Sequence, residues 1–291
     1  MDNPFDYLKF QTDLVSLKTR FPEAGLITVA KSRMGRDIFA LSAGSLKGAN
    51  VIIGGFEGND AISPSIILTF ASRYFDALFS GNELSEINIK AACEKGSVIF
   101  IPCINPDGAV IYQRGFSFGM SWLKNNGGFL QCRQKDYRAN AAGVELDGNF
   151  DHDFEGRRKK ERLFGKYTKS PCGFSGEKAF SEPESAGLRD FLLNVKPRLV
   201  CKLSPGEGEI LWRSENPHKN SHRIAKVVSS LSGYPLEAEI GSPAEGSFRQ
   251  WASEKLSAPS IEIKVDERFK PCDFKKIYAE LEETLAVISV I

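Results

Sequence analysis

The chain has 291 residues, with 42% hydrophobic and 26% charged side chains and a formal net charge of +1. This composition is typical of a globular protein, and the charge gives no reason to expect a nucleic-acid or membrane partner. No linker or repeat divides the chain, so we expect one domain over 1–291. The six cysteines form no C-x-x-C pair and no signal peptide precedes the first helix, which favours a cytoplasmic protein with free thiols.

Strand-like and helix-like segments alternate along the sequence. Short apolar runs bounded by turn residues predict strands, and apolar residues at helical spacing predict amphipathic helices. This alternation predicts an α/β fold with a largely parallel or mixed sheet. The predicted strands are 26–30, 38–41, 51–53, 98–102, 199–203, 210–212 and 260–265, and the predicted helices are 3–17, 63–79, 181–195, 221–231 and 273 to near the C-terminus.

Two segments between these elements have distinctive compositions. Asn105-Pro106-Asp107-Gly108 is a strong turn signal, and Ser181-Glu182-Pro183-Glu184 has the pattern of a capping box. The region 109–180 is rich in Gly and Asn and is predicted to be mostly loop. Within it, 156–166 carries six basic residues. That segment is either a patch for an anionic ligand or a solvated surface loop, and we favour the loop.

Several motifs, taken in chain order, resemble those of the carboxypeptidase A-like zinc peptidases. The most similar branch is the bacterial one that cuts γ-D-glutamyl–diamino acid bonds in cell-wall peptides. The resemblance covers nearly the whole chain and implies a mixed, roughly eight-stranded sheet with helices on both faces and a site at the carboxyl ends of central strands. The segments are 54–60 (family G-G-x-H-G-x-E), 104–108 (N-P-D-G), 137–150 (R-x-N-x-x-G-V-D-L-N-R-N-F), 180–184 (F-S-E-P-E), 246–248 (G-S) and 260–263 (T-I-E-L).

The resemblance implies roles for four residues outside the metal ligands. The family holds zinc on three side chains and uses a glutamate as general base and an arginine to stabilise the oxyanion. Glu262 stands at the glutamate position, and Arg138 stands at the position of the cation that stabilises the oxyanion or binds substrate. Their alternatives are a polar strand end and a loop salt bridge. Asn140 and Asp147 stand at positions that the resemblance implies for substrate binding, although Asp147 replaces an asparagine.

The zinc ligands themselves are replaced. Glu57 stands for the first histidine, and Asp60 stands for the glutamate. The third histidine falls on Ser204, or on Leu203 if the loop is gapped differently, and neither is a normal zinc ligand. The chain has only three histidines, and none occupies a ligand position: His152, His218 and His222.

Four carboxylates are therefore expected near one another, with Arg138 opposite them: Glu57, Asp60, Asp147 and Glu262. Crowded carboxylates cannot all ionise without a compensating cation. A hard metal such as Ca²⁺ or Mg²⁺ would satisfy them, as would a ligand's ammonium group. Otherwise they stay protonated or form salt bridges with the protein.

We therefore expect a zinc carboxypeptidase-like protein with a degenerate zinc site. It is expected to be non-catalytic or independent of zinc, and to bind a peptide or cell-wall peptide fragment in the ancestral cleft. The alternative is an active peptidase with a carboxylate-bound metal and Glu262 as general base. A third hypothesis is a scaffold that uses the fold for contacts alone.

Overall fold

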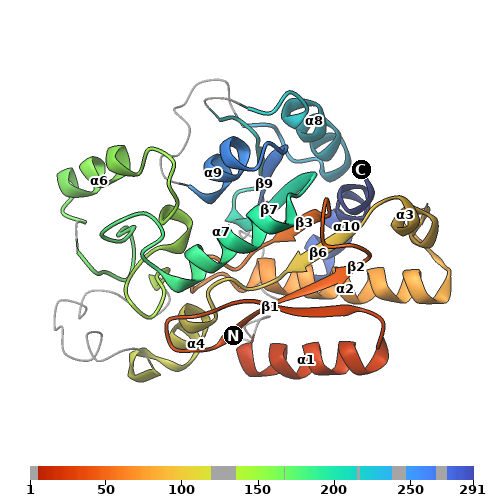
Figure 1. Cartoon of the computed structure of the whole chain (residues 1–291), viewed down its shortest axis with the longest axis horizontal. Helices are drawn as coiled ribbons and strands as arrows, with labels where there is room; N and C mark the ends of the chain where they lie inside the picture. Colours follow the sequence, from red (N-terminus) through yellow and green to blue (C-terminus); the bar gives the residue numbers. More distant parts are fainter. Residues whose placement is uncertain (1–5, 119–135, 167, 215–216, 238–246, 267–273) are drawn as a thin grey trace.

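The computed structural model describes residues 6–118, 136–166, 168–214, 217–237, 247–266 and 274–291. A seven-stranded mixed sheet organises them, in the order β1-β2-β6-β3-β7-β9-β8 (Figure 1). Four of its strands, β6, β3, β7 and β9, are parallel, and the flanking strands β1, β2 and β8 are antiparallel to their neighbours. The predicted fold class is confirmed, with seven strands in this sheet where about eight were expected. The strands are β1 (Gly25–Lys31), β2 (Asp37–Ala43), β3 (Asn50–Ile53), β6 (Val98–Ile101), β7 (Leu199–Gly206), β8 (Glu209–Leu211) and β9 (Ser260–Asp266), with a separate hairpin of β4 (Glu83–Leu84) and β5 (Ile87–Asn88).

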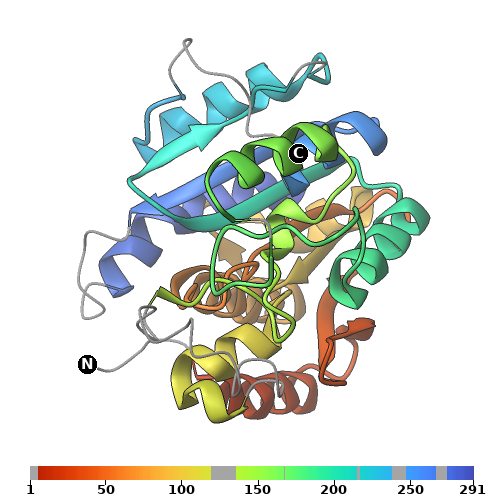
Figure 2. The same ribbon diagram turned by 90° about the vertical axis from the view of Figure 1, so that its left-hand side faces the viewer.

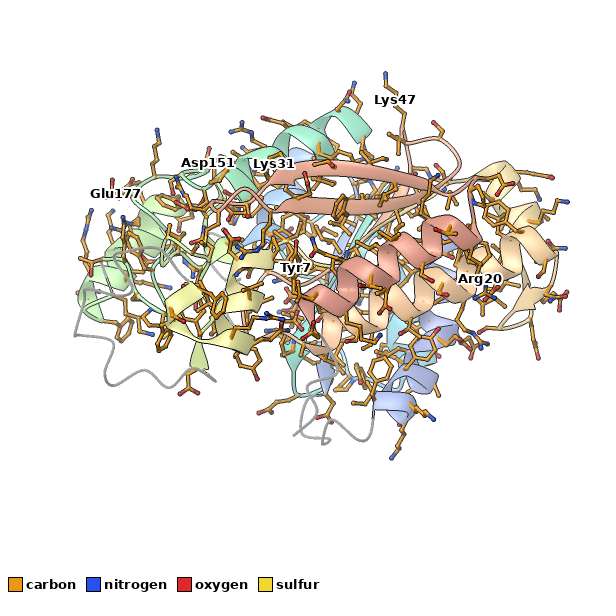
Figure 3. All side chains as sticks on the ribbon, turned by 90° about the horizontal axis from the view of Figure 1, so that it is seen from below. Tyr7, Arg20, Lys31, Lys47, Asp151 and Glu177 are labelled. Atoms are coloured by element: carbon orange, nitrogen blue, oxygen red, sulfur yellow. The ribbon has the colours of Figure 1, made fainter. Side chains whose placement is uncertain are left out.

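Helices cover both faces of the sheet. Because side chains alternate along a strand, Ile52 packs on one face while Val51 and Ile53 pack on the other. α1, α2, α3, α8 and α10 contribute to the first core, and α7 and α9 to the second. Figure 3 shows α1 crossing the underside of the molecule between Tyr7 and Arg20. The helices are α1 (Tyr7–Arg20), α2 (Ile62–Ser80), α3 (Ile89–Lys95), α4 (Pro106–Arg114), α6 (Phe154–Leu163), α7 (Pro183–Val195), α8 (Ser221–Ser232), α9 (Phe248–Lys255) and α10 (Phe274–Val290).

Three local predictions are corrected by the structure. Asn105 is not in a turn but caps α4, where its side chain accepts a hydrogen bond from the N–H of Gly108 at 2.9 Å. The capping box before α7 is not formed, because the N-cap is Glu182 and its side chain makes no capping bond. The basic segment predicted as loop is largely the helix α6. The start predicted at Asn3 lies outside the described residues, and α1 begins at Tyr7.

Two further observations concern the whole of the described chain. None of its helices combines the length and apolar character needed to span a bilayer. Four cysteines within it are free thiols, namely Cys93, Cys103, Cys172 and Cys201. The other two cysteines of the sequence lie outside the described residues.

Candidate functional site

The Gly54–Asp60 segment is the loop that leaves the carboxyl end of β3. Gly54 continues the sheet by donating its N–H to the carbonyl of Ile101 at 3.0 Å. Gly55 then turns the chain with a φ of +68°, and a Cβ there would lie 2.8 Å from the Cα of Cys103. Only glycine fits this combination of left-handed backbone and close approach. The loop therefore holds Glu57 and Asp60 at the edge where the parallel strands end.

Asp60 is buried and serves the backbone rather than an open site. Its carboxylate accepts hydrogen bonds from the N–H groups of Gly55 at 3.2 Å and Ser63 at 2.9 Å, the second in the first turn of α2. Burial raises the pKa of Asp60 to about 6, although these hydrogen bonds oppose the shift. Asp60 thus fixes the loop to the start of α2.

Glu57 lies against an arginine. Its Oε1 is 2.5 Å from Nη2 of Arg138, whose Nε is 3.2 Å from the carboxylate of Glu145. Burial raises the pKa of Glu57 to about 7, although the Arg138 guanidinium favours the ionised form. The side chain of Arg138 is 46% exposed. Arg138 therefore joins the two carboxylates while part of its guanidinium stays open to solvent.

A lysine that the motif comparison did not single out occupies the centre of the site. Lys202 lies on β7, in register with Ile53 of β3 and Glu262 of β9. Its Nζ is 2.7 Å from Oδ1 of Asp147 and 3.1 Å from Oε1 of Glu262, and it lies 5.2 Å from the ring centroid of Phe56. The side chain is 4% exposed. Burial alone would lower the pKa of Lys202, but the two carboxylates outweigh it and raise this pKa above its ordinary value. The ammonium is therefore kept charged.

Glu262 is surrounded by donors and positive charge. Ser204, on the same face of β7 as Lys202, donates its hydroxyl to Oε1 at 2.6 Å. Arg249 of α9 and Lys264 of β9 place nitrogens 3.8 Å and 4.0 Å from the carboxylate. Burial opposes ionisation of Glu262, but the Lys202 ammonium dominates and holds its pKa below the ordinary value. Glu262 is thus a fixed carboxylate.

Asp147 shares the same ammonium. Burial would raise the pKa of Asp147, yet the charge and hydrogen bond of Lys202 lower it below its usual range. The neighbouring Gly148 leaves room for Arg157, whose guanidinium carbon would lie 2.4 Å from a Cβ at that position. Asp147 is placed by the short 3-10 helix Leu146–Gly148, which positions it above β7. With 28% of its side chain exposed, it marks where the site opens to solvent.

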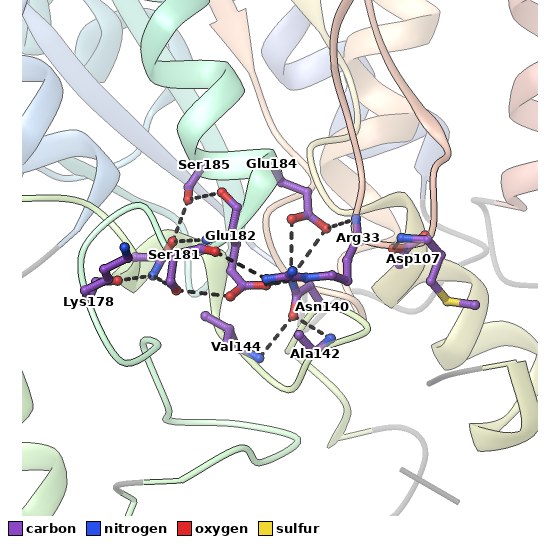
Figure 4. A network of polar contacts seen from close by, with 12 residues as sticks. Arg33, Asp107, Asn140, Ala142, Val144, Lys178, Ser181, Glu182, Glu184 and Ser185 are labelled. Carbon is purple, nitrogen blue, oxygen red and sulfur yellow. Dashed lines mark hydrogen bonds and ion pairs between the residues drawn. The ribbon is translucent and has the colours of Figure 1, made fainter. Parts of the chain in front are cut away.

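Asn140, predicted to bind substrate, lies in a buried hydrogen-bond network. It is fully buried, and its Nδ2 donates to Glu182 at 2.9 Å, while its Oδ1 accepts from the N–H groups of Ala142 and Val144 at 2.9 Å and 3.1 Å. Figure 4 shows these bonds, and Arg33 donates to the same carboxylate oxygen of Glu182. The side chain holds the loop after Arg138 against the start of α7 and has no free edge for a ligand.

The side chains at the zinc-ligand positions do not fit a metal ion. Glu57 is bound to Arg138, Asp60 to backbone N–H groups, and Ser204 to Glu262. Leu203, the alternative third position, points into the opposite core. Within the described ranges no three His, Cys, Asp or Glu side chains are grouped to hold a metal. The carboxylate cluster expected for Ca²⁺ or Mg²⁺ is therefore not formed there, and the ammonium of Lys202 supplies the missing cation.

The three histidines of the chain do not take the place of the zinc ligands. His152 is buried, and its Nδ1 lies 2.9 Å from the carboxylate of Glu254. His222 stacks on Trp212 with ring centroids 4.4 Å apart. His218 precedes α8 and contributes its Nδ1 to a backbone hydrogen bond. None lies in contact with Lys202 or Glu262 in the described interactions.

Sequence reasoning placed Glu57, Asp147, Ser204 and Glu262 at this edge of the sheet, and the structure brings Asp147, Ser204 and Glu262 within reach of one another. It missed Lys202 and, with it, Arg249. One signal was present: Lys202 interrupts an apolar run predicted as a buried strand. A buried lysine needs a paired carboxylate, so this residue pointed to Glu262 or Asp147.

Known proteins are similar to this chain over most of its length. The zinc carboxypeptidase family profile matches residues 11–285. The γ-D-glutamyl-L-diamino acid endopeptidase 1 of Lysinibacillus sphaericus is 22% identical over 287 residues, which are 95% of this chain and 70% of that protein. The inactive metallocarboxypeptidase ECM14 of Arthroderma benhamiae is 25% identical over 181 residues, which are 58% of this chain and 26% of that protein.

Solved structures share the fold. Bovine thrombin-activatable fibrinolysis inhibitor, in complex with tick carboxypeptidase inhibitor, matches with a TM-score of 0.74 and 16% identity over 98% of this chain and 96% of that chain. The murein-tripeptide amidase MpaA of Escherichia coli O157 matches with a TM-score of 0.56 and 17% identity over 94% of this chain and 93% of that chain. Because the family profile covers nearly the whole sequence, the chain belongs to the zinc carboxypeptidase family.

Proposed function

We propose that this protein is a non-hydrolytic member of the zinc carboxypeptidase family that binds a peptide, of the cell-wall peptide class, at the ancestral cleft. The observation that carries the proposal is the ammonium of Lys202, 2.7 Å from Asp147 and 3.1 Å from Glu262. It provides a fixed positive charge at the centre of the site, supplied by the protein. The site is therefore electrostatically complete without a metal ion.

The same contacts argue against hydrolysis by the family's chemistry. A general base must accept a proton from water, and its pKa must lie near the working pH for this to be efficient. The Oε1 of Glu262 already accepts from Ser204 and lies beside Lys202, and its pKa is lowered. A carboxylate held in this way is a poor base. This favours the non-catalytic hypothesis over a peptidase that uses Glu262.

Peptide binding is supported by a hollow next to the hydrogen-bond network of Asn140. It has a volume of about 630 Å³, within the usual range of ligand pockets, and Ala142, Val144 and Phe174 form its apolar wall. Side chains of both charge signs surround that wall: Arg33, Lys169, Glu177, Lys178 and Glu182. Figure 4 shows that Arg33 and Glu182 belong to the Asn140 network, which connects the hollow to the loop carrying Arg138. A lining of mixed charge suits a peptide with free ammonium and carboxylate groups.

The relatives supply the ligand class. One is named a γ-D-glutamyl-L-diamino acid endopeptidase, and a structural neighbour is titled a murein-tripeptide amidase. The fungal relatives are named inactive metallocarboxypeptidases, so the family includes other members without activity. A scaffold role without a small ligand is disfavoured by the open hollow.

Binding and hydrolysis are tested separately. Elemental analysis of the purified protein is expected to find far less than one zinc per chain. Mass spectrometry should find no cleavage of an L-alanyl-γ-D-glutamyl-diaminopimelate peptide, with or without added Zn²⁺. Calorimetry should show saturable binding of this peptide, weakened by Arg33→Ser and Arg138→Gln. A peptide of the same composition with an α-linked L-glutamate is the matched control.

Two results would contradict the proposal in different ways. Stoichiometric zinc with cleavage of the γ-linked bond would show an active peptidase. Absence of binding, or equal binding of both peptides, would show that the proposed ligand class is wrong. It would not contradict the proposal that the protein does not hydrolyse peptides. Substitution of Lys226, an exposed residue of α8, should change none of these measurements.

A further inference from the structure

The helix that carries the basic segment projects at one end of the molecule. α6 lies at the left of Figure 1, away from α1, α2 and α10, and faces the viewer in Figure 2. Its inner face is anchored to the protein. Glu161 lies 3.2 Å from Arg157, forms an ion pair with Arg158, and accepts from the N–H of Ser175 at 3.0 Å. The Arg158 guanidinium also covers the ring of Phe174 at 4.9 Å. These two arginines hold the helix in place.

The end of α6 presents two apolar side chains to solvent. Leu163 is 83% exposed and Phe164 is 76% exposed, more than any other large hydrophobic side chain in the described residues. Gly165, with a φ of +69°, terminates the helix, and the N–H of Lys166 closes the turn on the carbonyl of Glu161 at 2.7 Å. The hydrogen-bonded end of the helix therefore holds the backbone of Leu163 and Phe164 in place, with both side chains exposed to solvent.

Positive charge surrounds this pair. Lys159, Lys160, Arg162 and Lys166 are all exposed. Among the ion pairs found in the described part of the chain, none involves Lys159, Arg162 or Lys166. The exposed acidic residues of this region, Asp151, Asp153 and Glu155, precede α6 or lie in its first turn. The helix thus separates negative charge at its start from positive charge at its apolar tip.

We propose that the tip of α6 is a docking surface for an anionic lipid bilayer. Leu163 and Phe164 enter the interfacial region, and the surrounding lysine and arginine side chains contact the headgroups. A bilayer fits better than a protein groove, since the tip is a projecting helix end with a small apolar apex and charge of one sign. A surface of this size gives weak, reversible binding. The proposal does not depend on the function proposed for the cleft.

The test is co-sedimentation of the purified protein with vesicles. Vesicles of phosphatidylcholine with 30% phosphatidylglycerol are expected to bind it, and pure phosphatidylcholine vesicles are expected to bind it at least about tenfold less. Lys159→Gln/Arg162→Gln should lower the partition coefficient about 30-fold, because each basic side chain near an anionic surface contributes about fivefold. Leu163→Ser/Phe164→Ser should lower it at least about tenfold.

Matched variants control for general charge and exposed apolar area. Lys219→Gln/Lys226→Gln removes two exposed lysines in and beside α8, and Leu8→Ser/Val15→Ser removes two exposed apolar side chains of α1. Both are expected to bind as the unmodified protein does. Equal binding to the two vesicle types, or equal loss in the control variants, would overturn the proposal. So would self-association that the Leu163→Ser/Phe164→Ser change abolishes, since a second copy would then be the occupant.

Discussion

Replacing Lys202 with methionine isolates the role of its charge. Methionine has a similar length, and it removes the ammonium together with the cation–π contact that the ammonium makes with the ring of Phe56. The change leaves Asp147 and Glu262 facing one another without the cation between them. Arg249 and Lys264, at 3.8 Å and 4.0 Å from Glu262, compensate only in part.

The magnitude follows from the two contacts of Lys202. At an effective dielectric constant of about 20, charges separated by 2.7 Å and 3.1 Å attract by about 6 and about 5 kcal/mol. Removing the ammonium from water offsets much of this attraction in the unmodified protein. Measured losses on breaking buried ion pairs are about 3–5 kcal/mol, and we expect that loss for Lys202→Met at pH 7. This is a large share of the typical stability of about 5–15 kcal/mol.

The loss should depend on pH with a defined sign. In the unmodified protein the pKa values of Asp147 and Glu262 are lowered, so their stabilising contribution is present above about pH 4 and is lost as the pH falls through the folded values. In Lys202→Met, burial is no longer offset and these pKa values rise. The variant then loses stability as the pH increases. The difference in the free energy of unfolding between the unmodified protein and Lys202→Met should therefore be less than half as large at pH 4 as at pH 7.

Urea unfolding followed by circular dichroism at pH 4, 5.5 and 7 measures this difference. Lys226→Met, an exposed change of the same type, should alter the free energy of unfolding by no more than about 0.5 kcal/mol. A variant that unfolds at the same urea concentration as the unmodified protein at pH 7 would refute the assignment of Lys202 as the central cation. A loss that is constant with pH would refute its coupling to the two carboxylates.

Three further predictions concern the loops around the site. Asn140→Ala should lower the free energy of unfolding by about 2–4 kcal/mol in urea titrations, because it leaves two buried N–H groups without a partner and removes one of the donors to Glu182; an effect below 1 kcal/mol would contradict its structural role. Glu57 has a pKa raised from 4.5 to about 7, so its contribution is favourable below pH 4.5 and is lost as the pH rises through 7. In Glu57→Gln, the decline in the free energy of unfolding with rising pH should be smaller by up to about 3 kcal/mol. If the free energy of unfolding of both proteins changes with pH in the same way, burial does not raise the pKa of Glu57. Addition of 0.1 mM Zn²⁺, or of a chelator, should leave the melting temperature within about 1 °C, whereas occupancy of a tight site would raise it by several degrees.

The fold could be predicted from the sequence because the patterns that indicate its strands and helices are local in the chain. The seven predicted strands all appear, since short apolar runs such as the one at Val98–Ile101 are bounded by turn residues. The sequence predictions were less accurate where a side chain can bond either to neighbours in the sequence or to distant residues. Asn105 starts a helix instead of a turn, and Asn140 turns inward because Glu182, 42 residues away, offers it an acceptor.

By itself, the sequence determined the α/β class and the family, and it predicted that the zinc ligands are replaced. These properties depend on residue identity and order along the chain, as in the change to Glu57 and Asp60 in the Gly54–Asp60 segment. Only the tertiary structure showed which cation lies between Asp147 and Glu262. Lys202 and Glu262 lie 60 residues apart, and the parallel register of β7 and β9 brings them together. The net charge of +1 likewise concealed the cationic tip of α6, because a sum over the chain contains no information about where charges gather.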